Sequence, residues 1–179
     1  MTDIDDDILQ PAAGRESKQK SLLDRIATEL RRLNQAEATG ELAALRRMDR
    51  RSVPPAAFYR IMARVGATEM KSDTVYRWAR AVAIMAQRPD ALRAFGLGET
   101  LKAIGVSEPR LDMLLYARGP ALCDLAHRTA VRIARSHEFL PYRDLCQLVL
   151  YDGRSEKSSD ADDVRIRIAQ SYLRAKDQT

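Results

Sequence analysis

The sequence has few aromatic residues, only two cysteines and no long apolar run. Aromatic side chains make up 6% of its 179 residues, so a core must be built mainly from aliphatic side chains and alanine. Leu and Ala favour helices, whereas β-branched residues, which favour strands, are in the minority. No run approaches the roughly 20 apolar residues that a membrane-spanning helix needs. We therefore predict an all-α protein, a helical bundle, without a membrane-spanning segment or a membrane partner.

Signals for secretion are missing as well. Cys123 and Cys146 are too few for a disulfide framework, which predicts a reduced protein. The first ten residues contain four aspartates and no basic residue, whereas a secretory signal begins with basic residues and an apolar stretch. We therefore expect a cytoplasmic protein.

Motifs of common enzymes and metal sites are absent. There is no Walker loop, GxGxxG, HExxH or paired-carboxylate motif. Cys123 and His127 lie four residues apart on one expected helix, and His137 and Cys146 would have to complete a tetrahedral metal site. An enzyme that uses Cys123 and His127 is one alternative. The favoured interpretation is a packed cysteine beside a surface histidine, with no catalytic residue, no metal and no cofactor.

Positive charge, by contrast, is in excess and unevenly distributed. The net charge is +5, although the first ten residues carry four negative charges. Residues 40–154 contain 19 Lys and Arg against 12 Asp and Glu, a net of +7. Of the 30 basic residues, 24 are Arg, whose planar guanidinium group suits phosphate oxygens. A GC-rich genome would also favour arginine codons, but it would not produce the positive excess.

Apolar periodicity and helix-breaking residues divide the chain into short helices. Apolar residues at helical spacing from Leu23 to Leu33 predict a first helix, and the aspartates at 160–163 mark the start of the last. Further helices are expected to begin near Gly40, Pro55, Ser72, Ser107, Pro120 and Pro141. Glycines between residues 90 and 106 predict a hinge. We predict two small packed helical subdomains: a disordered acidic tail (1–16) is followed by an N-terminal helical subdomain (17–95) and a C-terminal helical bundle (96–176).

Several arginines repeat at one-turn spacing on these helices. Like charges at this spacing repel, and a polyanion would relieve the repulsion and release counterions. Acids such as Glu41, Asp49 and Asp124 offer an alternative in which the arginines pair with carboxylates. No helix-turn-helix or aromatic RNA-binding motif is present, so we expect contact with the nucleic acid backbone rather than with base sequence. The repeated arginines are Arg46, Arg47, Arg50, Arg51, Arg60, Arg64, Arg128, Arg132 and Arg135.

Several sequence blocks occur in an order and spacing that resemble a known family. The blocks are GELAALRR (40–47), PAAFYRIMARVG (55–66), LGETLKA (97–103), SEPRLDMLLYARG (107–119), PYRDLCQLVLY (141–151) and a helical end over 164–173. Together they resemble the CasB family, the small subunit of the type I-E CRISPR Cascade complex. The sequence departs from the family pattern at Glu99, where we expect a base, and at Tyr151, where we expect Trp.

The resemblance implies a non-catalytic, all-α subunit of an antiviral, RNA-guided complex. It implies that two copies pack head to tail and help to hold the crRNA–target DNA duplex and the displaced strand, which stabilises the R-loop. The implied partners are the other Cascade protein subunits, the guide crRNA, the target and displaced DNA strands and a second copy of the chain. The predicted nucleic-acid-binding residues are Arg46, Arg47, Arg60, Arg64, Arg110, Arg128, Arg132 and Arg135. The main alternative is a structural adaptor whose arginines pair with acidic protein partners.

Overall fold

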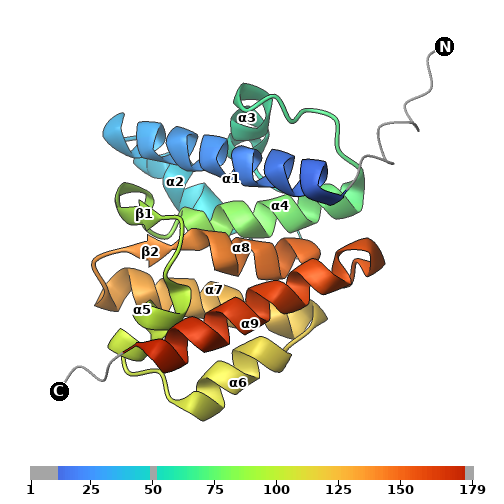
Figure 1. Cartoon of the computed structure of the whole chain (residues 1–179). Coiled ribbons are helices and arrows are strands. Elements are labelled where there is room, and N and C mark those ends of the chain that lie inside the picture. Colours follow the sequence, from blue (N-terminus) through green and yellow to red (C-terminus); the bar gives the residue numbers. More distant parts are fainter. Residues whose placement is uncertain (1–11, 49–51, 176–179) are drawn as a thin grey trace.

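The structure, a computed structural model, describes residues 12–48 and 52–175, while residues 1–11, 49–51 and 176–179 lie outside the described part. The regular secondary structure of the described chain is helical except for one short strand pair (Figure 1), which confirms the all-α prediction. The α-helices are α1 (Ala12–Gln35), α2 (Thr39–Arg46), α3 (Ala56–Arg64), α4 (Ser72–Met85), α5 (Leu97–Ala103), α6 (Glu108–Tyr116), α7 (Gly119–Ser136), α8 (Tyr142–Tyr151) and α9 (Ser158–Arg174). The remaining elements are two 3₁₀ helices, η2 (Pro89–Ala91) and η3 (Ser155–Lys157), and two strands, β1 (Leu92–Arg93) and β2 (Leu140–Pro141).

Proline, glycine and serine mark the helix limits largely where the sequence predicted them. Pro55 and Pro141 immediately precede α3 and α8, and Pro120 is the second residue of α7. Gly66 follows α3 with a φ of +72°, a conformation that glycine adopts without a steric penalty. Ser107 precedes α6 in an extended conformation, but its side chain makes no capping hydrogen bond.

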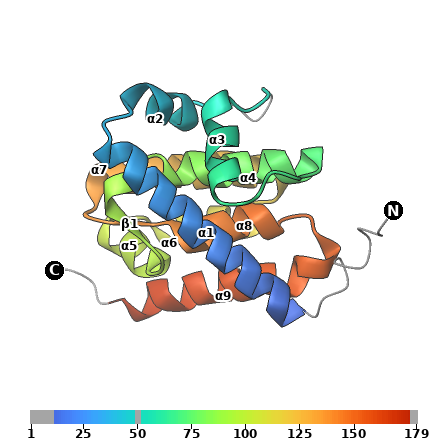
Figure 2. The same ribbon diagram turned by 90° about the horizontal axis from the view of Figure 1, so that it is seen from above.

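Three helices form the centre of the molecule. α4 and α8 lie side by side, and α7 packs against both (Figure 1). α1 and α2 pack on α4, and α3 packs on α1 and α2, with α1 crossing obliquely over the molecule (Figure 2). On the other side, α9 packs on α8 and α5, and α6 packs on α7. The buried apolar side chains form one cluster that crosses the predicted boundary at residues 95 and 96, so the division into two subdomains stays a prediction.

Every residue of α8 is buried, although the helix contains charged and polar side chains. Arg143 donates a 2.6 Å hydrogen bond to Asp24 of α1. Asp144 accepts hydrogen bonds of 3.1 and 2.7 Å from Arg167 of α9. Because a buried charge is destabilising without a partner, these pairs allow α8 to lie between α4, α7 and α9. The buried surface of α8 therefore includes charged and polar side chains as well as apolar ones.

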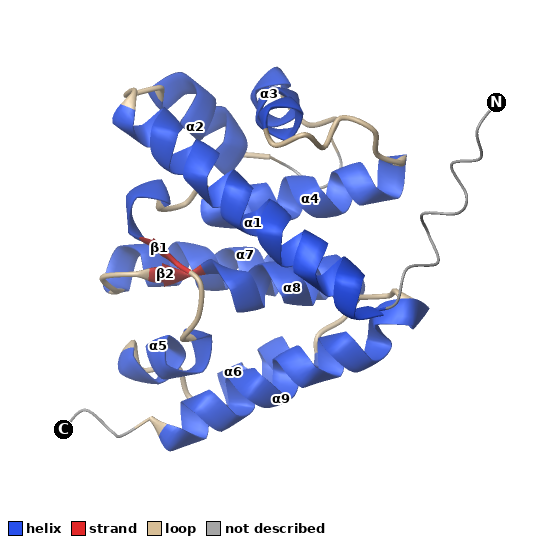
Figure 3. Ribbon diagram, turned by 45° about the horizontal axis from the view of Figure 1, so that its top comes forward, coloured by secondary structure: helices blue, strands red, loops and turns tan. Residues whose placement is uncertain are grey.

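A short parallel strand pair joins the segment after α4 to the segment before α8 (Figure 3). Leu92 pairs with Leu140, and Arg93 pairs with Pro141. Arg31 of α1 donates a 2.8 Å hydrogen bond to the carbonyl oxygen of Leu92. The sequence predicted only a hinge here, because a two-residue strand is too short to show an alternating pattern.

The close approach of α5 to α9 depends on one glycine. A Cβ atom built on Gly98 would lie 2.3 Å from the carbonyl oxygen of Ile168 and 2.5 Å from the backbone nitrogen of Tyr172. These backbone atoms cannot move aside without shifting α9. Glycine is therefore required within α5 despite its low helix propensity.

The N-terminal boundary differs from the prediction. Residues 1–11 of the predicted acidic tail lie outside the described part, and α1 begins at Ala12. Residues 12–16 therefore lie in a helix, which starts directly after Pro11 with two alanines, the residues with the highest helix propensity. No described helix is long and apolar enough to cross a membrane.

Candidate nucleic-acid interface

Many arginines hydrogen-bond to carbonyl groups at the C-terminal ends of helices. The last carbonyl groups of a helix lack partners within the helix, and a guanidinium group can satisfy them from a distance in the sequence. In each helix from α3 to α8, a carbonyl oxygen in the last turn or at the C-cap accepts a hydrogen bond from an arginine that lies far away in the sequence. In helix order the pairs are Arg25–Val65, Arg46–Ala86, Arg132–Ile104, Arg165–Leu115, Arg88–His137 and Arg77–Asp152. Part of the arginine excess is therefore structural.

Two of the predicted nucleic-acid-binding residues belong to this capping group. Arg46 Nε lies 2.7 Å from the Ala86 carbonyl oxygen, and Arg132 Nη2 lies 3.0 Å from that of Ile104. Both side chains are half-buried. The neighbouring Arg47 is exposed, and its Nε donates to the carbonyl of Ala43 within the same helix.

The two predicted arginines of α3 are paired with acids of neighbouring helices. Arg60 Nη2 lies 3.4 Å from Glu41 of α2, and Arg64 Nη1 lies 3.6 Å from Glu29 of α1. Side chains of both arginines are nearly half exposed, so these ion pairs contribute little to stability. They nevertheless neutralise the positive charge of this surface, as the adaptor alternative requires.

The arginines of α6 and α7 are different. Arg110, Arg128 and Arg135 are exposed, and none makes a hydrogen bond or ion pair with a described residue. With Arg132 they form what we call the α7 arginine face, defined as Arg110, Arg128, Arg132 and Arg135. Its three exposed members keep all guanidinium donors available to an anion.

Neighbouring depressions connect the members of this face. A groove of about 440 Å³ between α5, α6 and α7 is lined by Arg110, Arg128 and Arg132. A second depression, of about 320 Å³, includes Arg128, Arg132 and Arg135. A third, of about 250 Å³, extends from Arg128 to Met48, just after α2. Arg128 lines all three, so the face continues toward the end of α2 and does not include α3.

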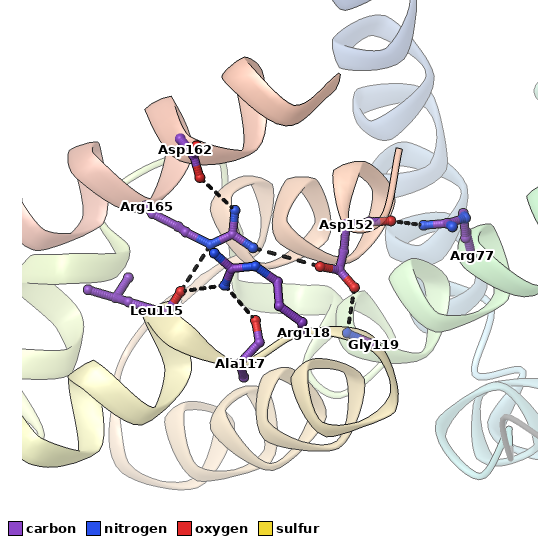
Figure 4. A network of polar contacts seen from close by, with 8 residues as sticks. All are labelled: Arg77, Leu115, Ala117, Arg118, Gly119, Asp152, Asp162 and Arg165. Atoms are coloured by element: carbon purple, nitrogen blue, oxygen red, sulfur yellow. Dashed lines mark hydrogen bonds and ion pairs between the residues drawn. The ribbon is translucent and has the colours of Figure 1, made fainter. Parts of the chain in front are cut away.

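A second arginine-rich region, drawn in Figure 4, is held by hydrogen bonds and ion pairs within the chain. Arg118 and Arg165 donate to the same carbonyl oxygen, that of Leu115, at 2.9 and 3.0 Å. Arg165 also lies 3.2 Å from Asp162 and 3.8 Å from Asp152, which accepts a 2.6 Å hydrogen bond from the first N–H group of α7. Burial, and then the nearby Arg118 charge, lower the pKa of Arg165. This network joins the ends of α6, α7, α8 and α9.

The cysteine and histidine of the enzyme alternative have pKa shifts that disfavour proton transfer from the thiol to the imidazole. Burial raises the pKa of the Cys123 thiol, although Arg80 Nη1 lies 3.2 Å from its sulfur atom, and burial also raises the pKa of Cys146. Protonated thiols are poor nucleophiles. Burial lowers the pKa of His127, which the Asp124 carboxylate offsets only in part. Within residues 12–48 and 52–175, no group of three or more His, Cys, Asp and Glu side chains could hold a metal ion.

Comparison with known protein families identifies the family to which this chain belongs. The family model described as CRISPR-associated protein Cse2 matches residues 41–173, about three quarters of the chain. The chain belongs to the Cse2 family. Membership of the Cse2 family confirms the predicted CasB identity and makes the chain a subunit of a CRISPR Cascade complex. No curated protein and no solved structure gave a significant match. The range matched by the Cse2 family contains every predicted nucleic-acid-binding arginine.

The sequence did not reveal two properties of this Cse2-family surface. The spacing of Arg128, Arg132 and Arg135 predicted one stripe, but not that Arg132 is held by α5. The apolar floor of the groove was also missed, because the sequence alone does not show that Leu125, on the same helix, lines a groove beside the arginines. Its position three residues before Arg128 is the one signal that could have placed an apolar side chain beside the arginines.

Proposed function

We propose that this Cascade subunit binds the nucleic acid backbone through the α7 arginine face and so stabilises the R-loop. The observation that carries the proposal is the contrast between two sets of exposed arginines. Arg60 and Arg64 have acidic partners, whereas Arg110, Arg128 and Arg135 have none among the described residues. Uncompensated arginines on one surface are typical of phosphate contacts.

The energetics of R-loop formation make such a surface effective. The RNA–DNA hybrid is about as stable as the DNA duplex that it replaces, so modest contacts with the backbone can shift the balance. Each phosphate neutralised by an arginine releases condensed counterions, which favours binding most at low salt. We therefore expect binding by the isolated subunit to be weak, insensitive to base sequence and steeply reduced by salt.

The proposed partners follow from this role. They are the other Cascade protein subunits, the guide crRNA, the target and displaced DNA strands and a second copy of the chain, in a cytoplasmic complex. No residue is assigned a catalytic role. The contribution of the subunit is to hold strands that base pairing has already selected, which requires backbone contacts rather than base-specific ones.

A structural adaptor is the second candidate function, and the α3 surface favours it. The Arg60–Glu41 and Arg64–Glu29 pairs make this surface electrically mixed, which is compatible with the polar rim of an interface with another protein subunit. The two functions can coexist, with α3 facing protein and α7 facing nucleic acid.

The test compares two double variants that remove and reverse the same amount of charge. Cascade is assembled with the wild-type subunit, with R128E/R135E or with R60E/R64E, and the retention of bound target DNA is measured. We expect R128E/R135E to shorten retention while complex assembly is unchanged, and R60E/R64E to leave retention near the wild-type level. Equal retention in all three complexes would remove the α7 arginine face from the mechanism and leave the adaptor function.

A further inference from the structure

The groove beside the α7 arginine face has an apolar floor, which is not required for binding a phosphate backbone. Apart from its three arginines and Thr129, the lining of the groove is apolar. The aliphatic lining residues are Leu101, Val106, Leu111, Leu114 and Leu125, with Met113 beside them on α6. Met113 is 59% exposed, so the apolar surface of the groove continues onto the outer face of α6. A ligand that fills this groove should carry both aliphatic side chains and negative charge.

The chain itself contains a segment of this chemistry. Residues 3–9 read Asp-Ile-Asp-Asp-Asp-Ile-Leu, which gives four carboxylates and three aliphatic side chains in seven positions. This segment lies outside the described residues. It has no basic residue, and its charge is opposite to that of the arginines around the groove.

We propose that residues 3–9 of one copy dock in the α5–α6–α7 groove of a second copy and compete there with nucleic acid. Ile4, Ile8 and Leu9 contact the aliphatic floor, while the aspartates contact Arg110, Arg128 and Arg132. A second copy is the source because the N-terminal end of α1 lies at the front of the molecule in Figure 1, whereas α7 lies behind α8 and α9, as the view from above in Figure 2 also shows. Only the competition rests on the proposed function.

Docking explains why aliphatic and acidic residues occur together in the segment. Carboxylates alone would be attracted to any arginine on the surface, including Arg47, and the attraction would be screened by salt. The aliphatic side chains add burial of apolar surface, which salt does not screen and of which this groove offers more than the other two depressions described above. The combination therefore directs the segment to one place.

The test uses the full chain with I4S/I8S/L9S substitutions as the receptor, so that its own segment does not compete. A fluorescent peptide of residues 1–10 is titrated into this receptor and compared with a peptide that carries the same three serines and the same charge. We expect the native peptide to bind at least about tenfold more tightly than the serine peptide, because three aliphatic side chains are buried. Equal binding of the two peptides would show diffuse attraction between charges and would overturn the docking.

Two further receptors locate the site and separate this inference from the proposed function. Adding R128E to the receptor should weaken binding of the native peptide. Adding R60E should leave the affinity for the peptide close to that of the parent receptor. Equal effects of the two substitutions would overturn the assignment to the groove. The native peptide should also displace a labelled oligonucleotide. If it binds without displacing the oligonucleotide, the competition is wrong. If the peptide does not bind while the oligonucleotide still depends on Arg128, the docking fails and the proposed function stands.

Discussion

Arg132 Nη2 lies 3.0 Å from the carbonyl oxygen of Ile104 and so connects α7 to the C-terminal end of α5. Arg128, one turn earlier on the same helix, is exposed and makes no hydrogen bond or ion pair with the part of the chain that the structure describes. Two arginines of one predicted stripe therefore differ in function: one mainly holds the fold together, and the other is available to a ligand.

This difference predicts that two alanine substitutions change stability by different amounts. Arg132→Ala should lower the free energy of unfolding by about 1–2 kcal/mol, because the end of α5 loses a charge-assisted hydrogen bond. Arg128→Ala should change it by less than about 0.5 kcal/mol, as expected for an exposed side chain without partners. Urea denaturation followed by circular dichroism measures both values. Similar stability losses in the two variants would contradict the assignment.

The contact between α5 and α9 predicts a strong effect at Gly98. Gly98→Ala places a methyl group against the backbone of Ile168, so we expect a loss of about 1–3 kcal/mol from overpacking. Gly40→Ala is the matched control, since Gly40 is also helical but has no atom within 4 Å of its Cβ position. That control should be neutral or stabilising by up to about 1 kcal/mol, because alanine has the higher helix propensity. Thermal and urea unfolding of both variants test the contact.

The Asp24 carboxylate joins α1 to α8 and predicts a measurable titration. Asp24 accepts hydrogen bonds of 2.7 Å from the Tyr142 hydroxyl and 2.6 Å from Arg143. Burial, and then this carboxylate, raise the pKa of Tyr142 to about 12. In Asp24→Asn the pKa of Tyr142 should fall, because the negative charge is lost, and stability should decrease, because the nearly buried Arg143 loses its counterion. Ultraviolet titration of the phenol tests this, and an unchanged pKa would show that burial alone causes the shift.

His127 predicts how stability depends on pH. Burial lowers its pKa in the folded state below the ordinary value of 6.5, so the unfolded chain binds a proton first as the pH falls. The stability contribution of neutral His127 is therefore present above pH 6.5 and is lost as the pH falls below it. His127→Gln should show a smaller loss of stability between pH 7 and pH 5 than the wild type. Equal slopes in the two proteins would show that His127 titrates normally.

The same shift means that the α7 arginine face owes its charge at neutral pH to arginine alone. Nucleic acid affinity should accordingly stay almost constant between pH 8 and pH 7, where neither arginine nor His127 changes its protonation. Fluorescence anisotropy at constant ionic strength measures it. A marked rise in affinity toward pH 7 would assign part of the binding to a histidine.

The sequence was sufficient to predict most helices, because residues at or near the helix ends, mainly proline and glycine, mark where they begin and end. Pro55, Gly66, Pro120 and Pro141 act within one or two residues of a helix end, and a local pattern can be read without knowing the fold. The two-residue strand pair has no such pattern. The full burial of α8 depends on distant partners, Asp24 and Arg167, whose positions only the folded chain defines.

The functions of individual arginines were less predictable for the same reason. The capping arginines satisfy carbonyl groups that lie far away in the sequence: Arg46 reaches Ala86, and Arg165 reaches Leu115. Helical spacing describes only the residues on the same helix, so Arg128 and Arg132 looked equivalent. Distinguishing a capping arginine from a free one requires the tertiary structure, and this distinction is what narrows the candidate site to α6 and α7.

The salt dependence of nucleic acid binding is the most direct test of the account. The logarithm of the affinity of the isolated subunit for a short DNA duplex is plotted against the logarithm of the salt concentration for the wild type, Arg128→Gln and Arg60→Gln. If Arg128 contacts a phosphate, its loss should reduce the magnitude of the slope by about 0.9, the value for one phosphate contact on duplex DNA. Arg60→Gln should leave the slope unchanged. A slope in Arg128→Gln equal to that of the wild type would contradict the claim that the α7 arginine face contacts the backbone.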